Sequence, residues 1–178
     1  MRIIRNTVFE TNSSSCHAIT FDDTPVDIQK QPVRLNIDGT GDFGRSGDDV
    51  IDPEEKLNYA LIAFIDYCTG QKVDEDQLYD TENEIKERVR RALTDVQQYF
   101  NTKNVEIEWD EPLFKLGHYK WDDKIAIYPK MYGYIDHQSG PHENNDCKML
   151  AEWFENDNEK LFNFCFNNSY IVLDNDNG

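Results

Sequence analysis

Long hydrophobic runs are missing from this sequence, since no stretch approaches the ~20 apolar residues that a helix needs to cross a bilayer. The apolar segment near the start, Ile3 and Ile4 between two arginines, is too short for a signal peptide. We therefore expect no membrane association and a cytoplasmic location.

Closely spaced cysteines are missing too. The four cysteines, Cys16, Cys68, Cys147 and Cys165, lack the tight pairing of a small secreted scaffold. We expect free thiols in a reducing compartment. Cys68 and Cys165 lie within apolar patterns of helical spacing, which predicts that both belong to the core.

Basic residues are scarce, with 18 Lys and Arg against 35 Asp and Glu and a formal net charge of -17. Such a surface repels phosphate backbones and is attracted to basic surfaces, including the nucleic-acid channels of nucleases. Direct DNA binding is therefore not expected unless Arg88, Arg90 and Arg91 form a local basic patch. An acidic surface that only aids solubility is the alternative.

The composition is nevertheless that of a folded protein. Of 178 residues, 38% are hydrophobic and 12% aromatic, which is enough to build a core. We predict a single α+β domain over residues 1 to 178, in which the low mean hydropathy reflects a charged surface.

Helix signals are strong in the middle of the chain. Asp52 followed by Pro53 and two glutamates is typical of a helix start, and apolar residues of helical spacing extend the helix over residues 53 to 69. Thr81 with Glu84 repeats the capping pattern and predicts a helix over residues 81 to 101. Two shorter helices are expected near residues 146 to 166.

Extended patterns account for the remaining elements. They predict a mixed or antiparallel sheet of five to seven strands, with the two longer helices on one face. The first two strands would form a hairpin over residues 2 to 21. The strand candidates are residues 3 to 9, 18 to 21, 33 to 37, 105 to 109, 124 to 128, 132 to 135 and 170 to 173.

Gly39-Thr40-Gly41-Asp42-Phe43-Gly44 matches the dinucleotide-binding glycine pattern in form. That motif has to open a helix that holds the pyrophosphate, whereas more loop sequence follows here. Asp42, Asp48 and Asp49 would also repel a phosphate. The segment therefore indicates a flexible loop, and no cofactor is expected.

Three polar segments each follow a strand candidate: residues 10 to 17, 136 to 143 and 174 to 177. If the strands are neighbours in a sheet, the polar segments meet at one edge, where binding sites are often built. Such a cluster would be a site or, in its mildest form, a buried hydrogen-bond network. Ordinary turns contain the same residue types.

One hypothesis for this cluster is an enzyme. Ser13, Ser14 or Ser15 would be the nucleophile and His17 or His137 the base, with Asp136 or Asp174 orienting the base. The sequence contains no Gly-x-Ser-x-Gly motif, which weakens this hypothesis.

A metal site is a further possibility. His137, His142 and Cys147 are spaced five residues apart, with Asp136 or Glu143 as added oxygen ligands. Zinc sites usually have tighter pairs. The final residues 174 to 178 are similar to a calcium loop, but they end before the ligands that an EF-hand requires.

Three segments of the chain are similar to sequences found in a known family. Residues 3 to 17, with Thr11-Asn12-Ser13-Ser14-Ser15-Cys16-His17, the Tyr134-to-Ser139 segment and the Asn168-to-Asn177 ending resemble a family of uncharacterised proteins of bacteriophages and mobile elements. Members often have a fourth serine where this chain has Cys16, which weakens any role that needs a hydroxyl there. The resemblance implies a phage setting in a bacterial host cell and no known activity.

Acidity, small size and this setting favour a binding protein over an enzyme. A rigid array of carboxylates can imitate the charge of a nucleic acid. We expect an anti-CRISPR or anti-restriction type of inhibitor, whose partner is a host nuclease or its guide-RNA complex. The alternative is a small hydrolase or transferase that uses the Ser/His/Asp cluster, with or without a metal. The expected binding residues are Glu82, Glu84, Glu87, Asp48 and Asp49.

Overall fold

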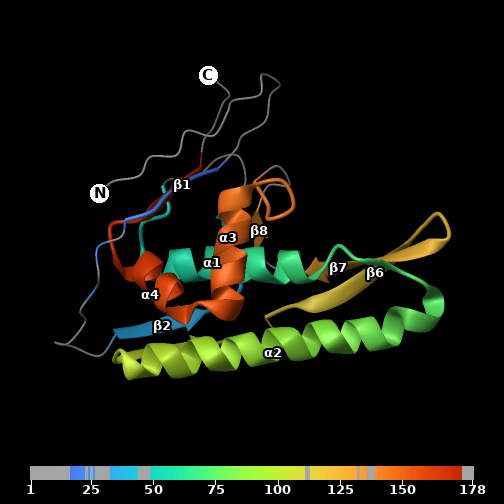
Figure 1. Ribbon diagram of the computed structural model, residues 1–178, viewed down its shortest axis with the longest axis horizontal. Coiled ribbons are helices and arrows are strands. Elements are labelled where there is room, and N and C mark those ends of the chain that lie inside the picture. Colours follow the sequence, from blue (N-terminus) through green and yellow to red (C-terminus); the bar gives the residue numbers. More distant parts are fainter. Residues whose placement is uncertain are drawn as a thin grey trace, which may run out of the picture.

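The computed structural model describes residues 17–22, 24, 26, 33–43, 49–110, 113–131, 133–135 and 139–173. Helices and strands alternate irregularly along the chain, which confirms the α+β class (Figure 1). The elements are β1 (Ala18–Thr20), β2 (Val33–Ile37), β3 (Asp42–Phe43), α1 (Pro53–Cys68), β4 (Lys72–Val73), the 3-10 turn η1 (Glu75–Gln77), α2 (Leu78–Thr102), β5 (Val105–Trp109), β6 (Lys115–Trp121), β7 (Lys124–Lys130), β8 (Tyr134–Ile135), α3 (Asn145–Asn156), α4 (Asn158–Phe166) and β9 (Tyr170–Val172).

Helix α1 is the centre of the molecule. It begins as predicted, with Asp52 Oδ1 accepting a hydrogen bond from the backbone N–H of Glu54 at 2.8 Å and Pro53 at the first helical position. Every residue from 56 to 65 is buried. Helix α3 crosses α1 in Figure 1, and the Phe64 and Phe154 rings stack there with their centroids 5.1 Å apart. A helix that is buried all round has to be covered on several sides.

Lys56 is the exception among the buried side chains of α1, because it is charged and only 1% exposed. Its ammonium group donates to the carbonyl oxygens of Phe164, Cys165 and Asn167 at 3.3, 3.3 and 3.1 Å. These carbonyls lie at the carboxyl end of α4, where helical hydrogen bonds run out and a cation is favourable. Lys56 therefore ties α4 to α1.

Helix α2 begins at Leu78, three residues before the predicted start at Thr81. The start predicted from the capping pattern is wrong because the half-buried Leu78 packs against the core. This tertiary contact extends the helix to residues before Thr81. The expected apolar face is confirmed. Its buried residues are Ile85, Val89, Ala92, Leu93, Val96 and Phe100.

The strands differ from the prediction of one sheet with five to seven strands. In the described part of the chain they form four small sheets: β1 with β9, β2 with β5, β3 with β8, and β4 with β7 and β6. The strands have only 2 to 7 residues, and β2, β7 and β8, which belong to three different sheets, each contact α1, whereas β1 contacts α3. Residues 3 to 9 of the predicted hairpin lie outside the described residues, and β1 pairs in antiparallel fashion with β9.

The parallel β2–β5 ribbon alternates as a half-buried sheet does. Leu35, Ile37, Val105 and Ile107 point inward, where α1 contacts β2 and α2 contacts β5. The opposite face is exposed to solvent and carries Arg34, Asn36, Glu106 and Glu108.

Three strands lie where the sequence predicted none, and one of them is the two-residue β4, which pairs with β7. Residues 115 to 121 form β6, an edge strand paired with β7 across a turn at Asp122, whose φ is 53°. Asp42–Phe43 forms β3, which pairs in parallel with β8, so the glycine segment is partly extended rather than a loop. The remaining predictions for 33 to 37, 105 to 109 and 170 to 173 are confirmed within a residue.

Burial explains the two core cysteines. Cys68 and Cys165 are fully buried as predicted, and loss of hydration raises the pKa of each thiol to about 12. Both therefore stay protonated at neutral pH. None of the helices among the described residues is long and apolar enough to cross a membrane.

Candidate functional site

Pairing of β1 with β9 brings parts of the polar segments together. Ala18 lies opposite Val172, and the preceding residue, His17, donates its backbone N–H to Ser139 Oγ at 2.9 Å. Asn144 Nδ2 donates to the His17 carbonyl at 3.0 Å. The end of the first polar segment, at His17, and Ser139 within the second therefore meet beside the strand that leads to the third.

This meeting point is a buried hydrogen-bond network. His17 is 1% exposed and Ser139 0%, and His17 Nδ1 lies 3.1 Å from the hydroxyl oxygen of Tyr59 on α1. Asn144 also caps α3, because its side-chain oxygen accepts hydrogen bonds from the N–H groups of Asp146 and Cys147. The described part of the network joins β1, α1 and α3, which is a structural role.

The other proposed catalytic residues lie outside the described residues. They are Ser13, Ser14, Ser15, Asp136, His137 and Asp174. The Ser/His/Asp enzyme hypothesis therefore stays a prediction.

The described metal candidates lie in different surroundings. His142 is exposed, and its Nε2 lies 3.1 Å from the backbone oxygen of Asp66. Cys147 is fully buried in the first turn of α3, and His137 is outside the described residues. Burial raises the pKa of the Asp66 carboxyl, with His142 acting in the opposite direction. Within the described ranges, no group of three or more His, Cys, Asp or Glu side chains is placed to hold a metal ion.

The acids that were predicted to bind a partner along α2 are largely paired. Glu82 lies 3.7 Å from Lys86 Nζ and 3.6 Å from His118 Nδ1. Glu87 pairs with Arg90. Glu84 is exposed, and Asp48 lies outside the described residues. A partner that bound α2 would compete with these cations.

Two of the three arginines of α2 that could have formed a basic patch, Arg88 and Arg90, are held in ion pairs. Arg88 makes two 2.5 Å contacts with Glu155 through Nε and Nη2, and Arg90 is held by Glu87. The two hydrogen bonds lower the pKa of Glu155 and raise that of Arg88. Arginine and carboxylate charges therefore offset each other along this helix.

A different group of carboxylates gathers where the carboxyl ends of β2 and β5 meet the start of α1. Glu54 Oε2 accepts the backbone N–H of Asn36 at 2.8 Å, and Asn36 lies opposite Glu108 in the ribbon. The Asp110 N–H donates to the Ile37 carbonyl at 2.9 Å, which places Asp110 beside Asp38. We call this the acidic surface; it consists of Asp38, Asp49, Asp52, Glu54, Glu55, Glu108 and Asp110.

Part of the acidic surface is hollowed. Asp38, Asp49, Glu54 and Glu55 line a depression of about 400 Å³ that has no basic residue in its described lining. Partial burial acts to raise the pKa of Asp38, but hydrogen bonds from the Thr40 hydroxyl and N–H, at 2.7 and 2.9 Å, hold it below its usual value. Among the described residues, none of the seven carboxylates lies within an ion pair.

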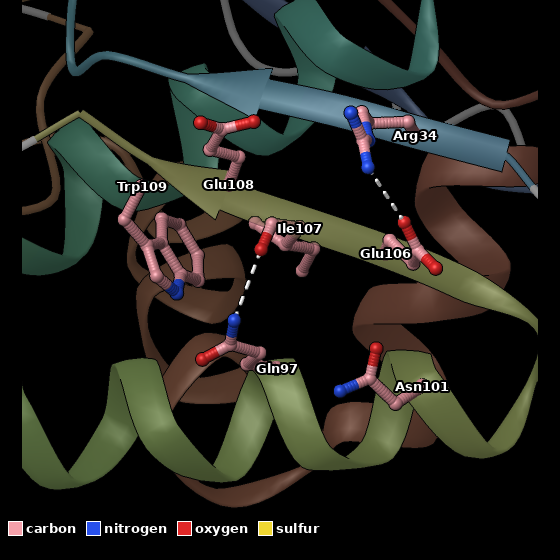
Figure 2. Close-up of a pocket in the computed structure, with 7 residues that line it drawn as sticks. All are labelled: Arg34, Gln97, Asn101, Glu106, Ile107, Glu108 and Trp109. Carbon is pink, nitrogen blue, oxygen red and sulfur yellow. Dashed lines mark hydrogen bonds and ion pairs between the residues drawn. The ribbon is translucent and has the colours of Figure 1, made fainter.

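A polar groove of about 610 Å³ lies beside β5 and α2. Figure 2 shows its lining residues, of which Glu108 also belongs to the acidic surface. Arg34 Nη2 donates to Glu106 Oε2 at 3.2 Å, and Gln97 Nε2 donates to the Ile107 carbonyl at 3.0 Å. The indole N–H of Trp109 also borders the groove and has no hydrogen-bond partner in the described structure. Arg34 forms its ion pair with Glu106 and not with Glu108. The negative charge of Glu108 therefore adds to that of the acidic surface.

Sequence reasoning missed the acidic surface, apart from Asp49. Its residues come from three separate segments, which the parallel β2–β5 pairing and the hydrogen bond between Asn36 and Glu54 bring together. The available signal was the run of acids around residues 49 to 55, which sequence analysis assigned to helix capping. Helix capping and an exposed acidic surface are compatible, since acids at a helix start also favour the helix dipole.

Comparison of the chain with models of known protein families, with curated proteins and with solved structures finds no match. The resemblance to the phage and mobile-element family thus stays a prediction from the three sequence motifs.

Proposed function

We propose that this protein is an acidic binding protein that inhibits a host nucleic-acid-processing nuclease by occupying its basic channel. The acidic surface would be the part that enters the channel. The setting in a bacteriophage or mobile element, and the anti-CRISPR or anti-restriction type of activity, are part of the same proposal.

The observation that carries the proposal is the difference between two sets of acids. Glu82 and Glu87 on α2 are held in ion pairs, whereas none of the seven carboxylates of the acidic surface lies in an ion pair with a described residue, and Asp52 alone has a cation nearby, the buried Lys56. Unpaired carboxylates on neighbouring elements present a dense negative charge, as phosphates do along a nucleic acid. A basic channel would supply the missing cations and gain affinity by electrostatic complementarity.

The rigidity of this surface supports the same function. Asp52 and Glu54 are held by hydrogen bonds at the start of α1, and α1 is the buried centre of the fold. A preorganised array loses little conformational entropy on binding, so more of the electrostatic attraction remains as affinity. Flexible acidic tails lack this advantage.

The test is a titration of a guide-RNA-loaded defence nuclease with this protein. We expect stoichiometric inhibition that target DNA competes away, that weakens steeply as salt rises and that leaves the nuclease mass unchanged. The triple variant Asp49→Lys, Glu55→Lys, Glu108→Lys should weaken inhibition by about tenfold or more.

The matched control changes net charge equally on α2, with Glu82→Lys, Glu84→Lys and Glu87→Lys. We expect a smaller effect, because two of these acids are already paired. A larger effect of the α2 variant would mean that the binding surface lies on that helix. Equal effects would mean that only the net charge of the protein matters and that the acidic surface is not the specific binding site.

The same titration tests the enzyme alternative. An enzyme would act in substoichiometric amounts, with an effect that grows with time and a shift in the mass of the target. Ser14→Ala, Ser15→Ala or His137→Ala would then abolish the effect, whereas a binding protein keeps it if folding is preserved. Catalytic inactivation with a mass shift would overturn the proposed function.

A further inference from the structure

The outer face of the β4–β7–β6 sheet differs in charge from the rest of the molecule. Residues directly opposite each other in an antiparallel pair point to the same side, so the register puts alternate residues of β6 and β7 on one face. Lys72 joins them because it pairs with Ala126. We call this the lysine–aromatic face; it consists of Lys72, Lys115, Tyr119, Trp121, Tyr128 and Lys130.

No acidic residue occurs in β4, β6 or β7, although the chain has 35 acids. Lys124 lies opposite Trp121 and so shares this face, but it is paired with Asp74 at 2.8 Å, which leaves three lysines of the face outside any ion pair with a described residue. Two of these, Lys115 and Lys130, lie directly opposite each other in the register. Like charges in such a pair repel, so an anionic ligand would relieve an unfavourable contact.

The aromatic rings of this face are accessible. Tyr119 is 47% exposed and Trp121 49%, and their ring centroids are 6.1 Å apart. Tyr128 lies 5.7 Å from Tyr119 between centroids, so the three rings form a continuous row. Figure 1 shows the β6–β7 hairpin reaching beyond the end of α1, away from the helical core.

Lysines accompany the rings closely. Lys72 Nζ lies 4.4 Å from the Trp121 ring, and Lys130 Nζ lies 5.9 Å from the Tyr128 ring. Gly117 makes this possible, because a Cβ there would come within 2.6 Å of both the Tyr128 ring and the Lys130 side chain. The absence of a side chain at residue 117 lets Tyr128 and Lys130 lie across β6.

We propose that the lysine–aromatic face binds single-stranded nucleic acid. Exposed rings in a row offer stacking surfaces to unpaired bases, and adjacent ammonium groups offer contacts to the backbone phosphates. Bases in a duplex are already stacked, so a duplex gains only the phosphate contacts. The face therefore discriminates in favour of single strands.

The net charge of the whole protein led us to expect no direct nucleic-acid binding, and this site differs from that expectation. Net charge averages over the surface, whereas a bound strand responds to the potential within about a Debye length, roughly 10 Å at 0.1 M salt. The acids that surround the sheet limit the affinity and sharpen its dependence on salt.

The experiment measures fluorescence anisotropy of labelled single-stranded oligothymidylate and oligouridylate, each of about 12 nucleotides, with a duplex of equal length for comparison. We expect weak binding at low salt that favours the single strands. With three lysines engaged, the slope of log K against log salt should be about -2.

Two pairs of variants test the two contributions. Trp121→Leu with Tyr119→Leu should weaken binding about tenfold or more and leave the salt slope unchanged. Lys72→Gln with Lys130→Gln should reduce the magnitude of the slope by about 1.4. Matched controls are Tyr79→Leu on α2 and Lys103→Gln directly after its last residue, which should bind as the unmodified protein does; circular dichroism checks the fold of each variant.

Three results would overturn the proposal. The first is no binding of either oligonucleotide at low salt. The second is equal binding of duplex and single strand, and the third is full affinity in the Trp121 and Tyr119 variant. None of these depends on the acidic surface, so the nuclease proposal stands or fails separately.

Discussion

Replacing Lys56 with methionine tests whether the buried ammonium group holds α4 against α1. Methionine has a similar length and favours helices, so Lys56→Met removes the charge with little loss of packing. Three carbonyl oxygens, those of Phe164, Cys165 and Asn167, lose their donor. At about 1 kcal/mol for each hydrogen bond, the gross loss is about 3 kcal/mol.

An opposing effect reduces this loss. Burial of a charge is unfavourable, and desolvation lowers the pKa of Lys56 despite the nearby Asp52. We therefore expect a net destabilisation of about 2 kcal/mol, which corresponds to a fall in Tm of about 4–8 °C for a chain of this size.

The assay is urea unfolding, followed by far-ultraviolet circular dichroism. Lys86→Met is the control, because Lys86 is exposed and lies 3.7 Å from its partner Glu82; its stability should change by less than about 0.5 kcal/mol. A Lys56→Met protein that is as stable as the unmodified protein would refute the reasoning, since desolvation would then outweigh the three hydrogen bonds.

The pH dependence of stability tests the burial of Lys56 independently. Because the folded pKa of Lys56 lies below the unfolded value of 10.5, the unfolded state binds more protons between the two values. The unmodified protein should therefore gain stability relative to Lys56→Met as pH rises through this window. A loss over the same window would contradict the burial effect.

Two further substitutions test other contacts. Glu155→Gln should lower the free energy of unfolding by about 1 kcal/mol at neutral pH. Because Arg88 lowers the pKa of Glu155, this loss of stability should persist above pH 4.5 and disappear as pH falls through the folded pKa. The assay is urea unfolding, with Glu152→Gln as the control. Gly133→Ala should lower the free energy of unfolding by about 1–3 kcal/mol, because its Cβ would come 2.2 Å from Ile62 Cδ1 and 2.5 Å from the backbone oxygen of Gly39. The assay is thermal unfolding. Unchanged stability would mean that the backbone next to β8 shifts to make room for the methyl group.

Local signals predicted the helices well. Asp52 and Pro53 identified the start of α1 because capping depends on neighbouring residues alone. Paired strands depend on residues far apart, so β6 was missed: its exposed outer half, around Tyr119 to Trp121, lacks the alternation that marks a half-buried strand. The division into small sheets follows from α1 being buried on all sides, which strand patterns do not reveal.

The candidate sites show the same limit. His17 was a candidate in the first polar segment, and the structure joins it by a hydrogen bond to Ser139 of the second, which was not a candidate. The acidic surface and the lysine–aromatic face were not predicted, because each collects residues from several segments. Net charge also concealed the lysines, since a total of -17 gives no information on how charges are distributed over the elements.

Pairing of β1 with β9 also has a consequence for synthesis on the ribosome. Asp22 and Ser169, just beyond the paired residues, are hydrogen-bonded although 147 residues separate them. Strand β1 thus emerges long before its partner, with Ile19 destined for the core. Until Tyr170–Val172 has been made, the nascent chain carries an unpaired apolar edge, which is the kind of surface that chaperones bind.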